Sequence, residues 1–176
     1  MRGLSHDFYV QPMNQVYIEA IAIYLFWTVT MLFFSKKARR IVSCIAAACA
    51  VGLIFMFTIF GRGGKSVAVS LIPFISFIEA KTQPELYRTM FMNMLLFLPL
   101  GLCLPFALPD KLRHKALISI LSGLILSVCV ETAQAVFCLG KCETDDVLMN
   151  TLGTLIGVTS FLINTMFVNC SVKHSC

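Results

Sequence analysis

Charged residues are scarce in this chain, which places it outside the usual range of soluble domains. Only 13% of its 176 residues are Asp, Glu, Lys or Arg, whereas about a quarter of the residues are charged in a typical soluble domain. Hydrophobic residues make up 58% of the chain, and its mean hydropathy is +0.84. This balance excludes an ordinary globular domain and predicts an integral membrane protein.

The length and the charge narrow the prediction further. Five membrane-spanning helices of roughly 20 residues need about 100 residues. The chain therefore has room for short loops only, and we expect a single membrane domain over residues 1–176. The net charge of +5 does not indicate a nucleic-acid partner, because in a membrane protein the position of Lys and Arg matters more than their sum.

Histidine is rare as well, and the cysteines form no recognisable framework. All three histidines, His6, His114 and His174, lie in predicted tails or loops. Cys138 and Cys142 lie four positions apart, and they either form a disulfide in an oxidised extracytoplasmic loop or remain free thiols. The sequence contains no zinc pattern and no Ser-His or Cys-His pair, so we predict no metal ion and no cofactor.

Five long apolar runs predict an all-α polytopic membrane protein. Each run approaches the length that a helix needs to cross about 30 Å of hydrocarbon. A sixth run, residues 67–78, is too short to span and contains Pro73, so we expect a re-entrant or interfacial segment within the 61–90 connection. The five predicted spans are residues 16–34, 41–60, 91–108, 116–137 and 147–168.

Basic residues predict the orientation of these helices. The segment SKKARR at 35–40 and the segment PDKLRHK at 109–115 are strongly basic, and such loops face the cytoplasm. With five spans, the N-terminus is then outside and the C-terminus is cytoplasmic. The predicted inner side carries eight basic residues and one acid, and the rest of the chain carries six basic residues and eight acids.

The fourth run contains an acid, Glu131, followed by Gln134. A charged side chain at the bilayer centre costs at least about 2.5–3.5 kcal/mol, so Glu131 requires an explanation. At helical spacing Ser127, Glu131 and Gln134 share one face. Either Glu131 takes part in function, or it forms a hydrogen bond with a neighbouring helix.

The fifth run begins with a second polar stripe. Asp145 and Asp146 suit the positive end of a helix dipole, but this does not explain Asn150, one turn further along. Asp146, Asn150, Gly153 and Gly157 lie on one side of the helix, and the two glycines form a GxxxG pattern that permits close helix approach.

Two further polar residues interrupt the second and third runs. Asn93 lies near the outer end of the third run, where an amide normally bonds to another helix. Arg62 ends the second run and is either an interfacial anchor or the counter-ion of Glu131 or Asp146. The stretch GRGGKS at 61–66 lacks the first glycine of a phosphate-binding loop, because Ile59 stands there. Alternating helices place all these residues on the outer side, which predicts one polar pocket.

These motifs resemble the VanZ-like family, over about residues 50–160. The matching stretches are FGR at 60–62, LIPF at 71–74, NMLLFLPLGLCLP at 93–105, ETAQ at 131–134 and GKCETDDVLMNTLGTLIG at 140–157. The family is named for a protein associated with low-level teicoplanin resistance in Gram-positive bacteria, so the resemblance implies a multi-pass protein of a bacterial plasma membrane. Lys141 stands where many members have Arg. The positions that match the family's polar residues are Arg62, Asn93, Glu131, Gln134, Asp145, Asp146 and Asn150.

Three functions remain open at this point. The resemblance implies a cell-envelope accessory protein that binds a lipid-linked or glycopeptide ligand in the outer leaflet. An intramembrane enzyme would use Glu131 as acid or base, with Asp145 and Asp146 polarising the substrate or binding a hard cation such as Mg²⁺. A small transporter is the third hypothesis, although five helices without an internal repeat make a poor scaffold for alternating access. Membrane lipids are partners in all three hypotheses.

Overall fold

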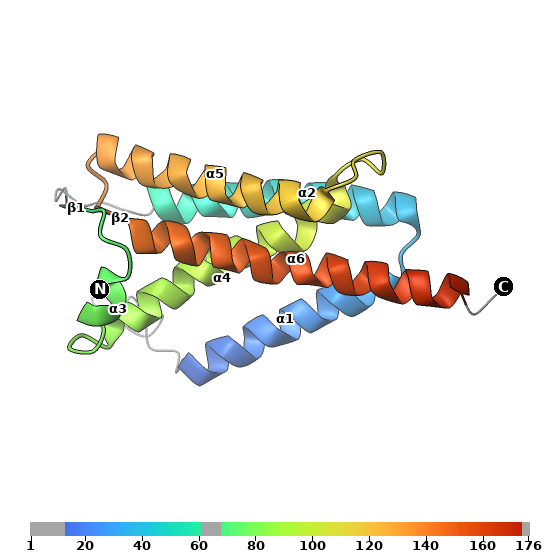
Figure 1. Ribbon diagram of the computed structural model, residues 1–176, viewed down its shortest axis with the longest axis horizontal. Helices are drawn as coiled ribbons and strands as arrows, with labels where there is room; N and C mark the ends of the chain where they lie inside the picture. Colours follow the sequence, from blue (N-terminus) through green and yellow to red (C-terminus); the bar gives the residue numbers. More distant parts are fainter. Residues whose placement is uncertain (1–12, 61–67, 174–176) are drawn as a thin grey trace, which may run out of the picture.

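Five long helices dominate the computed structural model, which describes residues 13–60 and 68–173. All five are long and apolar enough to cross a membrane, so the predicted multi-pass helical architecture is confirmed. Figure 1 shows them as one elongated bundle. The helices are α1 (Met13–Phe33), α2 (Lys36–Phe55), α4 (Glu85–Ala107), α5 (Lys115–Val136) and α6 (Thr144–Lys173).

Several helices extend beyond the predicted runs. Helix α4 begins at Glu85 rather than at residue 91, and α6 covers 30 residues from Thr144 to Lys173. Helix α2 continues as a π-helical turn, η2 (Met56–Phe60). Hydropathy alone missed these ends because polar residues can continue a helix beyond its apolar run, whereas the apolar stretch marks only the part suited to hydrocarbon.

The helices alternate in direction along the bundle. Helices α2 and α5 end near the start of α6, at the end of the bundle that carries the strands (Figure 1). At the opposite end, Lys36 and Asp110 line one groove, so the two basic connections lie together. The predicted gathering of basic segments at one end is therefore present, and the side of the membrane that this end faces stays a prediction.

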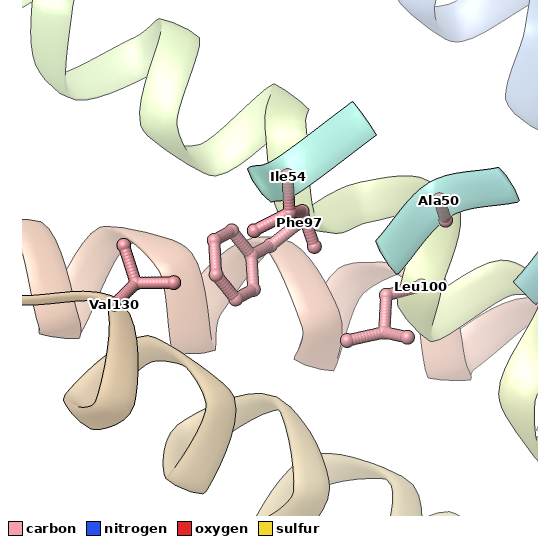
Figure 2. Packing of buried hydrophobic residues seen from close by; sticks show 5 residues of the cluster. All are labelled: Ala50, Ile54, Phe97, Leu100 and Val130. Atoms are coloured by element: carbon pink, nitrogen blue, oxygen red, sulfur yellow. The ribbon is translucent and has the colours of Figure 1, made fainter. Parts of the chain in front are cut away.

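Helix α4 forms the centre of the bundle, packed chiefly against α6 and α2. The fully buried Phe97 of α4 packs with Ile54 of α2 and Val130 of α5. Figure 2 shows the Phe97 ring between these two side chains. Ala50 and Leu100 complete the cluster, which joins α2, α4 and α5 beneath the strand-bearing end.

Glycines allow α4 and α6 to approach each other closely. A Cβ atom on Gly153 would collide with the backbone carbonyl of Met94, and one on Gly157 would collide with that of Leu98. Gly101 of α4 meets the backbone of α6 in the same way. The predicted close approach at the GxxxG pattern is confirmed, because no residue with a Cβ atom fits at this distance.

The connection between α2 and α4 contains β1 (Ala68–Ser70) and the short helix α3 (Ile75–Glu79). Strand β1 pairs in parallel with β2 (Lys141–Glu143), with Val69 opposite Cys142. The segment predicted as re-entrant or interfacial therefore forms a strand, a turn and a short helix. The strands were not predicted, because a three-residue strand shows no periodicity and its partner lies far away in the sequence.

Helix α1 joins the bundle through polar contacts in its second half. Trp27 Nε1 donates to the carbonyl of Leu102 at 3.0 Å, and Thr28 Oγ1 donates to Ser160 Oγ at 2.9 Å. An apolar cavity of about 380 Å³ lies between α1, α2 and α4. Helix α1 therefore contacts the core less extensively than the other four long helices do.

Candidate functional site

The predicted polar residues lie at the strand-bearing end of the bundle and are buried. Glu131 and Gln134 come from the last turns of α5, and Asn93 comes from the first half of α4. Asp145, Asp146 and Asn150 come from the first two turns of α6. Arg62 lies outside the described residues, so its predicted role as a counter-ion stays a prediction.

The carboxylate of Glu131 lies against strand β2. Its Oε2 accepts a hydrogen bond from the backbone N–H of Glu143 at 3.2 Å. The thiol of Cys142 also forms a hydrogen bond with this carboxylate. Only 5% of Glu131 is exposed. The parallel pairing of β2 with β1 holds these two donors in place, so the strands position groups of the site.

Asp145 uses its carboxylate to hold the loop before α3. Oδ1 accepts from the backbone N–H of Phe74 at 2.6 Å, and Oδ2 accepts from that of Ser76 at 2.8 Å. Phe74 has a left-handed backbone conformation, with φ of 65°, which is costly for a bulky residue and needs support from its surroundings. Asp145 gives that support, and it is fully buried.

Four carboxylates gather at this place. Glu131, Glu143, Asp145 and Asp146, together with the thiol of Cys142, are called the acid cluster below. Ser76 Oγ donates to Glu143 Oε2 at 3.2 Å. Because the backbone N–H of Ser76 donates to Asp145, Ser76 connects Glu143 with Asp145. The Nζ atom of Lys141 lies 3.7 Å from Glu143 Oε1, and the lysine side chain is 60% exposed.

The acid cluster creates a negative electrostatic environment. The pKa of the Cys142 thiol is raised, mainly by burial and then by the negative charges of Glu131, Asp146 and Glu143. The hydrogen bond with Glu131 acts in the same direction. Negative charge disfavours the thiolate because it would add a further anion. The same field would favour a positively charged group.

Amide side chains near the acid cluster connect neighbouring helices. Asn150 Nδ2 donates to Ser127 Oγ at 2.8 Å and connects α6 to α5. Gln134 Nε2 donates to the carbonyl of Thr58 at 2.9 Å and connects α5 to the π-helical turn. The last carbonyls of a helix have no intrahelical donor, so Gln134 satisfies a backbone group where α2 ends.

Three buried amides at this end of the bundle have one atom without a hydrogen-bond partner among the described residues. They are Asn93 Nδ2, Gln134 Oε1 and Asn150 Oδ1. A buried polar atom left unsatisfied costs about 1–3 kcal/mol, and most such atoms in proteins have a partner or an ordered water. These three atoms are therefore places where a ligand or a water molecule would gain a hydrogen bond.

The acid cluster is a closed arrangement rather than an open cavity. Asp146 is only 6% exposed, and Asn150 only 3%. The apolar cavity beside α1 and a groove at the basic end both lie elsewhere. A ligand that reaches the buried carboxylates must displace covering groups, and the loop that contains α3 is the segment that Asp145 and Glu143 hold in place.

No metal centre is apparent in the part of the chain that the structure describes. Within residues 13–60 and 68–173, no three or more His, Cys, Asp or Glu side chains form a group that could hold a metal ion. The hard-cation site considered for Asp145 and Asp146 gains no support, because both carboxylate oxygens of Asp145 already accept backbone donors.

Three residues that contact the site were not predicted from the sequence. Of the two alternatives for Cys138 and Cys142, the structure has the free thiols, and the contact of the Cys142 thiol with Glu131 was not predicted. Ser76 and Thr58 contribute through hydrogen bonds to residues that are far away in the sequence. The position of Cys142 between Lys141 and Glu143, shortly before the paired aspartates, was the one local signal available.

Comparisons with known proteins give one match. The model of the VanZ/LLP1 family matches residues 20–165. This range includes the acid cluster and the neighbouring amides Asn93, Gln134 and Asn150. No curated protein and no solved structure matches the chain.

Proposed function

The chain belongs to the VanZ/LLP1 family, and on that premise we propose that it is a cell-envelope protein of a bacterial plasma membrane. In this proposal it binds a lipid-like or glycolipopeptide ligand through the acid cluster and the neighbouring amides. The proposed role is accessory and is associated with resistance to teicoplanin-type glycopeptides. The strand-bearing end faces outward, as the distribution of Lys and Arg predicts.

The gathering of four carboxylates in the acid cluster is the observation that carries this proposal. Three carboxylates raise the pKa of the Cys142 thiol in addition to the effect of burial. A ligand with an ammonium group would interact favourably with these negative charges. Glycopeptides of the teicoplanin type carry amines together with an acyl chain, so they match a negative site at a membrane boundary.

The amides would supply hydrogen bonds to the same ligand. Asn93, Gln134 and Asn150 each have an atom without a partner among the described residues. Glycopeptides and lipid-linked sugars are rich in donors and acceptors, and a few convergent polar groups usually fix the orientation of a ligand. Glu131, Asp145 and Asp146 are buried, so a ligand that reaches them must displace the groups that cover them.

Binding of teicoplanin to the full chain in lipid nanodiscs tests the proposal. The wild type should bind teicoplanin, and N-acetylation of the free amine should weaken the complex. Glu131→Gln should weaken it by about tenfold to 100-fold, the usual range for loss of a charged hydrogen-bond partner. Glu79→Gln is the matched control, because Glu79 is an exposed carboxylate of α3 outside the acid cluster.

Two outcomes would contradict the proposal. Equal affinity of Glu131→Gln and the wild type would remove the acid cluster from recognition. Equal affinity for teicoplanin and its N-acetylated form would show that the amine is not the recognised group. Far-UV circular dichroism of both variants checks that the helical content is retained.

An intramembrane enzyme is the second candidate, and the burial of Glu131 beside other carboxylates favours it. A buried acid with neighbouring charges is typical of general acid–base groups. In this candidate Glu131 moves a proton, and Asp146 polarises the substrate. The raised pKa of the Cys142 thiol disfavours the thiolate and therefore argues against Cys142 as the nucleophile. A lipid product formed by the wild type and lost in Glu131→Gln would identify an enzyme.

A further inference from the structure

A groove lies at the basic end of the bundle, far along α2 from the acid cluster. It has a volume of about 580 Å³ and lies between the start of α2 and the connection from α4 to α5. Three cations stand at this groove, and apolar side chains of the next turns of α2 continue it along the helix. Its lining residues are Lys36, Lys37, Arg40, Ile41, Cys44, Ile45 and Asp110.

The three cations of the groove form no ion pair with a carboxylate among the described residues. Asp110 is the one acid in the lining, and its Oδ1 pairs with Lys115 Nζ at 2.8 Å. In residues 13–60 and 68–173, neither Lys36, Lys37 nor Arg40 forms an ion pair. The pKa of Asp110 is lowered chiefly by its hydrogen bond and charge interaction with Lys115, and more weakly by Lys36 and Arg40.

The position of these cations in the helix is unfavourable without an anion. Helix α2 begins at Lys36, and its first turn contains no acid. The N-terminus of a helix carries a partial positive charge, which favours anions and disfavours cations. Adjacent like charges add further repulsion. An anion in the groove would relieve both effects.

Arg39 serves as an internal comparison on the same turn. Its guanidinium lies 5.8 Å from the centre of the Phe106 ring, and Nη2 donates to the carbonyl of Phe34 at 3.2 Å. The guanidinium of Arg39 therefore interacts with other groups of the protein. Lys36, Lys37 and Arg40 are exposed, so their charges remain available to an external partner.

The apolar part of the groove indicates what kind of anion fits. Ile41 and Ile45 follow the cations along α2, one helical turn apart, and are 52% and 62% exposed. Positive charge with exposed isoleucines one or two turns further into the membrane matches an amphiphile. Its phosphate would lie among the cations, and its acyl chains would follow the isoleucines.

We propose that this groove binds the phosphate-bearing headgroup of an anionic phospholipid from the leaflet at the basic end of the bundle. Lys36, Lys37 and Arg40 surround the phosphate, and Ile41 and Ile45 contact the beginning of the acyl chains. The groove and the acid cluster lie at opposite ends of α2, so this site is separate from the proposed function.

Native mass spectrometry of the detergent-solubilised chain tests the proposal with two lipids of equal chain length, phosphatidylglycerol and phosphatidylcholine. The wild type should retain one phosphatidylglycerol more tightly than phosphatidylcholine. Lys36→Gln with Arg40→Gln should weaken phosphatidylglycerol binding by about 30-fold, at roughly 1 kcal/mol for each cation near a membrane surface.

Lys111→Gln with Arg113→Gln is the matched control. This pair removes the same charge from the adjoining connection, outside the groove, and should change the affinity less than threefold. The charge-preserving pair Lys36→Arg with Arg40→Lys should bind like the wild type and shows that the helix start tolerates substitution. Equal weakening by the two glutamine pairs, or equal binding of both lipids by the wild type, would overturn the proposal.

Discussion

The ionisation of the Cys142 thiol depends on the charge of the carboxylates in the acid cluster. The thiol contacts Glu131, and the negative charges of Asp146 and Glu143 raise its pKa further. A thiol next to carboxylates ionises only at higher pH, because the thiolate would be repelled by its neighbours. Its reactivity therefore reports the charge of the surrounding acids.

Glu131→Gln should lower the pKa of Cys142 towards its ordinary value, because a neutral amide replaces the carboxylate that acts most strongly among the neighbouring acids. The pH at which iodoacetamide modifies Cys142 half-maximally should move down in this variant. Peptide mapping of the alkylated chain over a pH series measures the shift. Glu79→Gln should leave the profile unchanged, and an unmoved profile in Glu131→Gln would mean that Glu131 is uncharged beside the thiol.

At the residue scale, the sequence located the buried acids but not their partners. Glu131 and Asp146 were recognisable because an acid next to a membrane-spanning run is costly. The partners of Asp145 were not recognisable, because Phe74 lies 71 positions away and donates through its backbone. A backbone donor leaves no trace in residue type, so such a contact becomes visible only in the folded chain.

The α4–α6 interface illustrates how glycines act on whole elements. Gly153 and Gly157 lie against backbone atoms of α4, whereas nothing lies within 4 Å of a Cβ atom built on Gly52 of α2. Glycine can therefore be replaced by alanine at Gly153, where a Cβ atom would collide with α4, and at Gly52, where there is space for it. Both sites are helical, so intrinsic helix propensity changes equally.

Gly153→Ala should destabilise the bundle by about 1–3 kcal/mol, the usual cost of overpacking. Gly52→Ala should be neutral or slightly stabilising, because alanine is favoured over glycine in a helix interior. Thermal unfolding in detergent, followed by circular dichroism, measures both effects. Equal stability of the two variants would mean that α4 and α6 do not rely on glycine for their close contact.

At the element scale, the helices were predictable and the strands were not. A long apolar run is a local property, so all five long helices could be read from the sequence. The helix ends differed, as at Glu85 and Thr144, because polar residues can extend a helix beyond the hydrocarbon. Strand β1 depends on β2 as its pairing partner, and no local pattern marks a pair of this kind.

For the whole molecule, the separation of charge between the two ends predicts its orientation. The basic connections gather at the end that contains Lys36 and Asp110, and the acid cluster lies at the other end. The excess of Lys and Arg predicts that the basic end faces the cytoplasm. The fold supports the alternation of the helices, and labelling must determine which way they face.

A membrane-impermeant maleimide added to intact cells should label Lys141→Cys, because residue 141 is exposed at the strand-bearing end. Lys111→Cys, exposed at the basic end, should react only after the cells are permeabilised. Both variants need a background without the other accessible cysteines. Labelling of Lys111→Cys alone in intact cells would reverse the predicted orientation.

The pairing of β1 with β2 also has a consequence for biosynthesis. Domains tend to form from the N-terminal side while the chain is being made, and α5 with Glu131 is synthesised before residues 141–146. Until then, Glu131 lacks its hydrogen bond from the backbone of Glu143, and the backbone N–H of Phe74 lacks its acceptor Asp145. A chain that stalls before β2 would therefore lack the contacts that join β1, the loop before α3 and the end of α5 in the finished bundle.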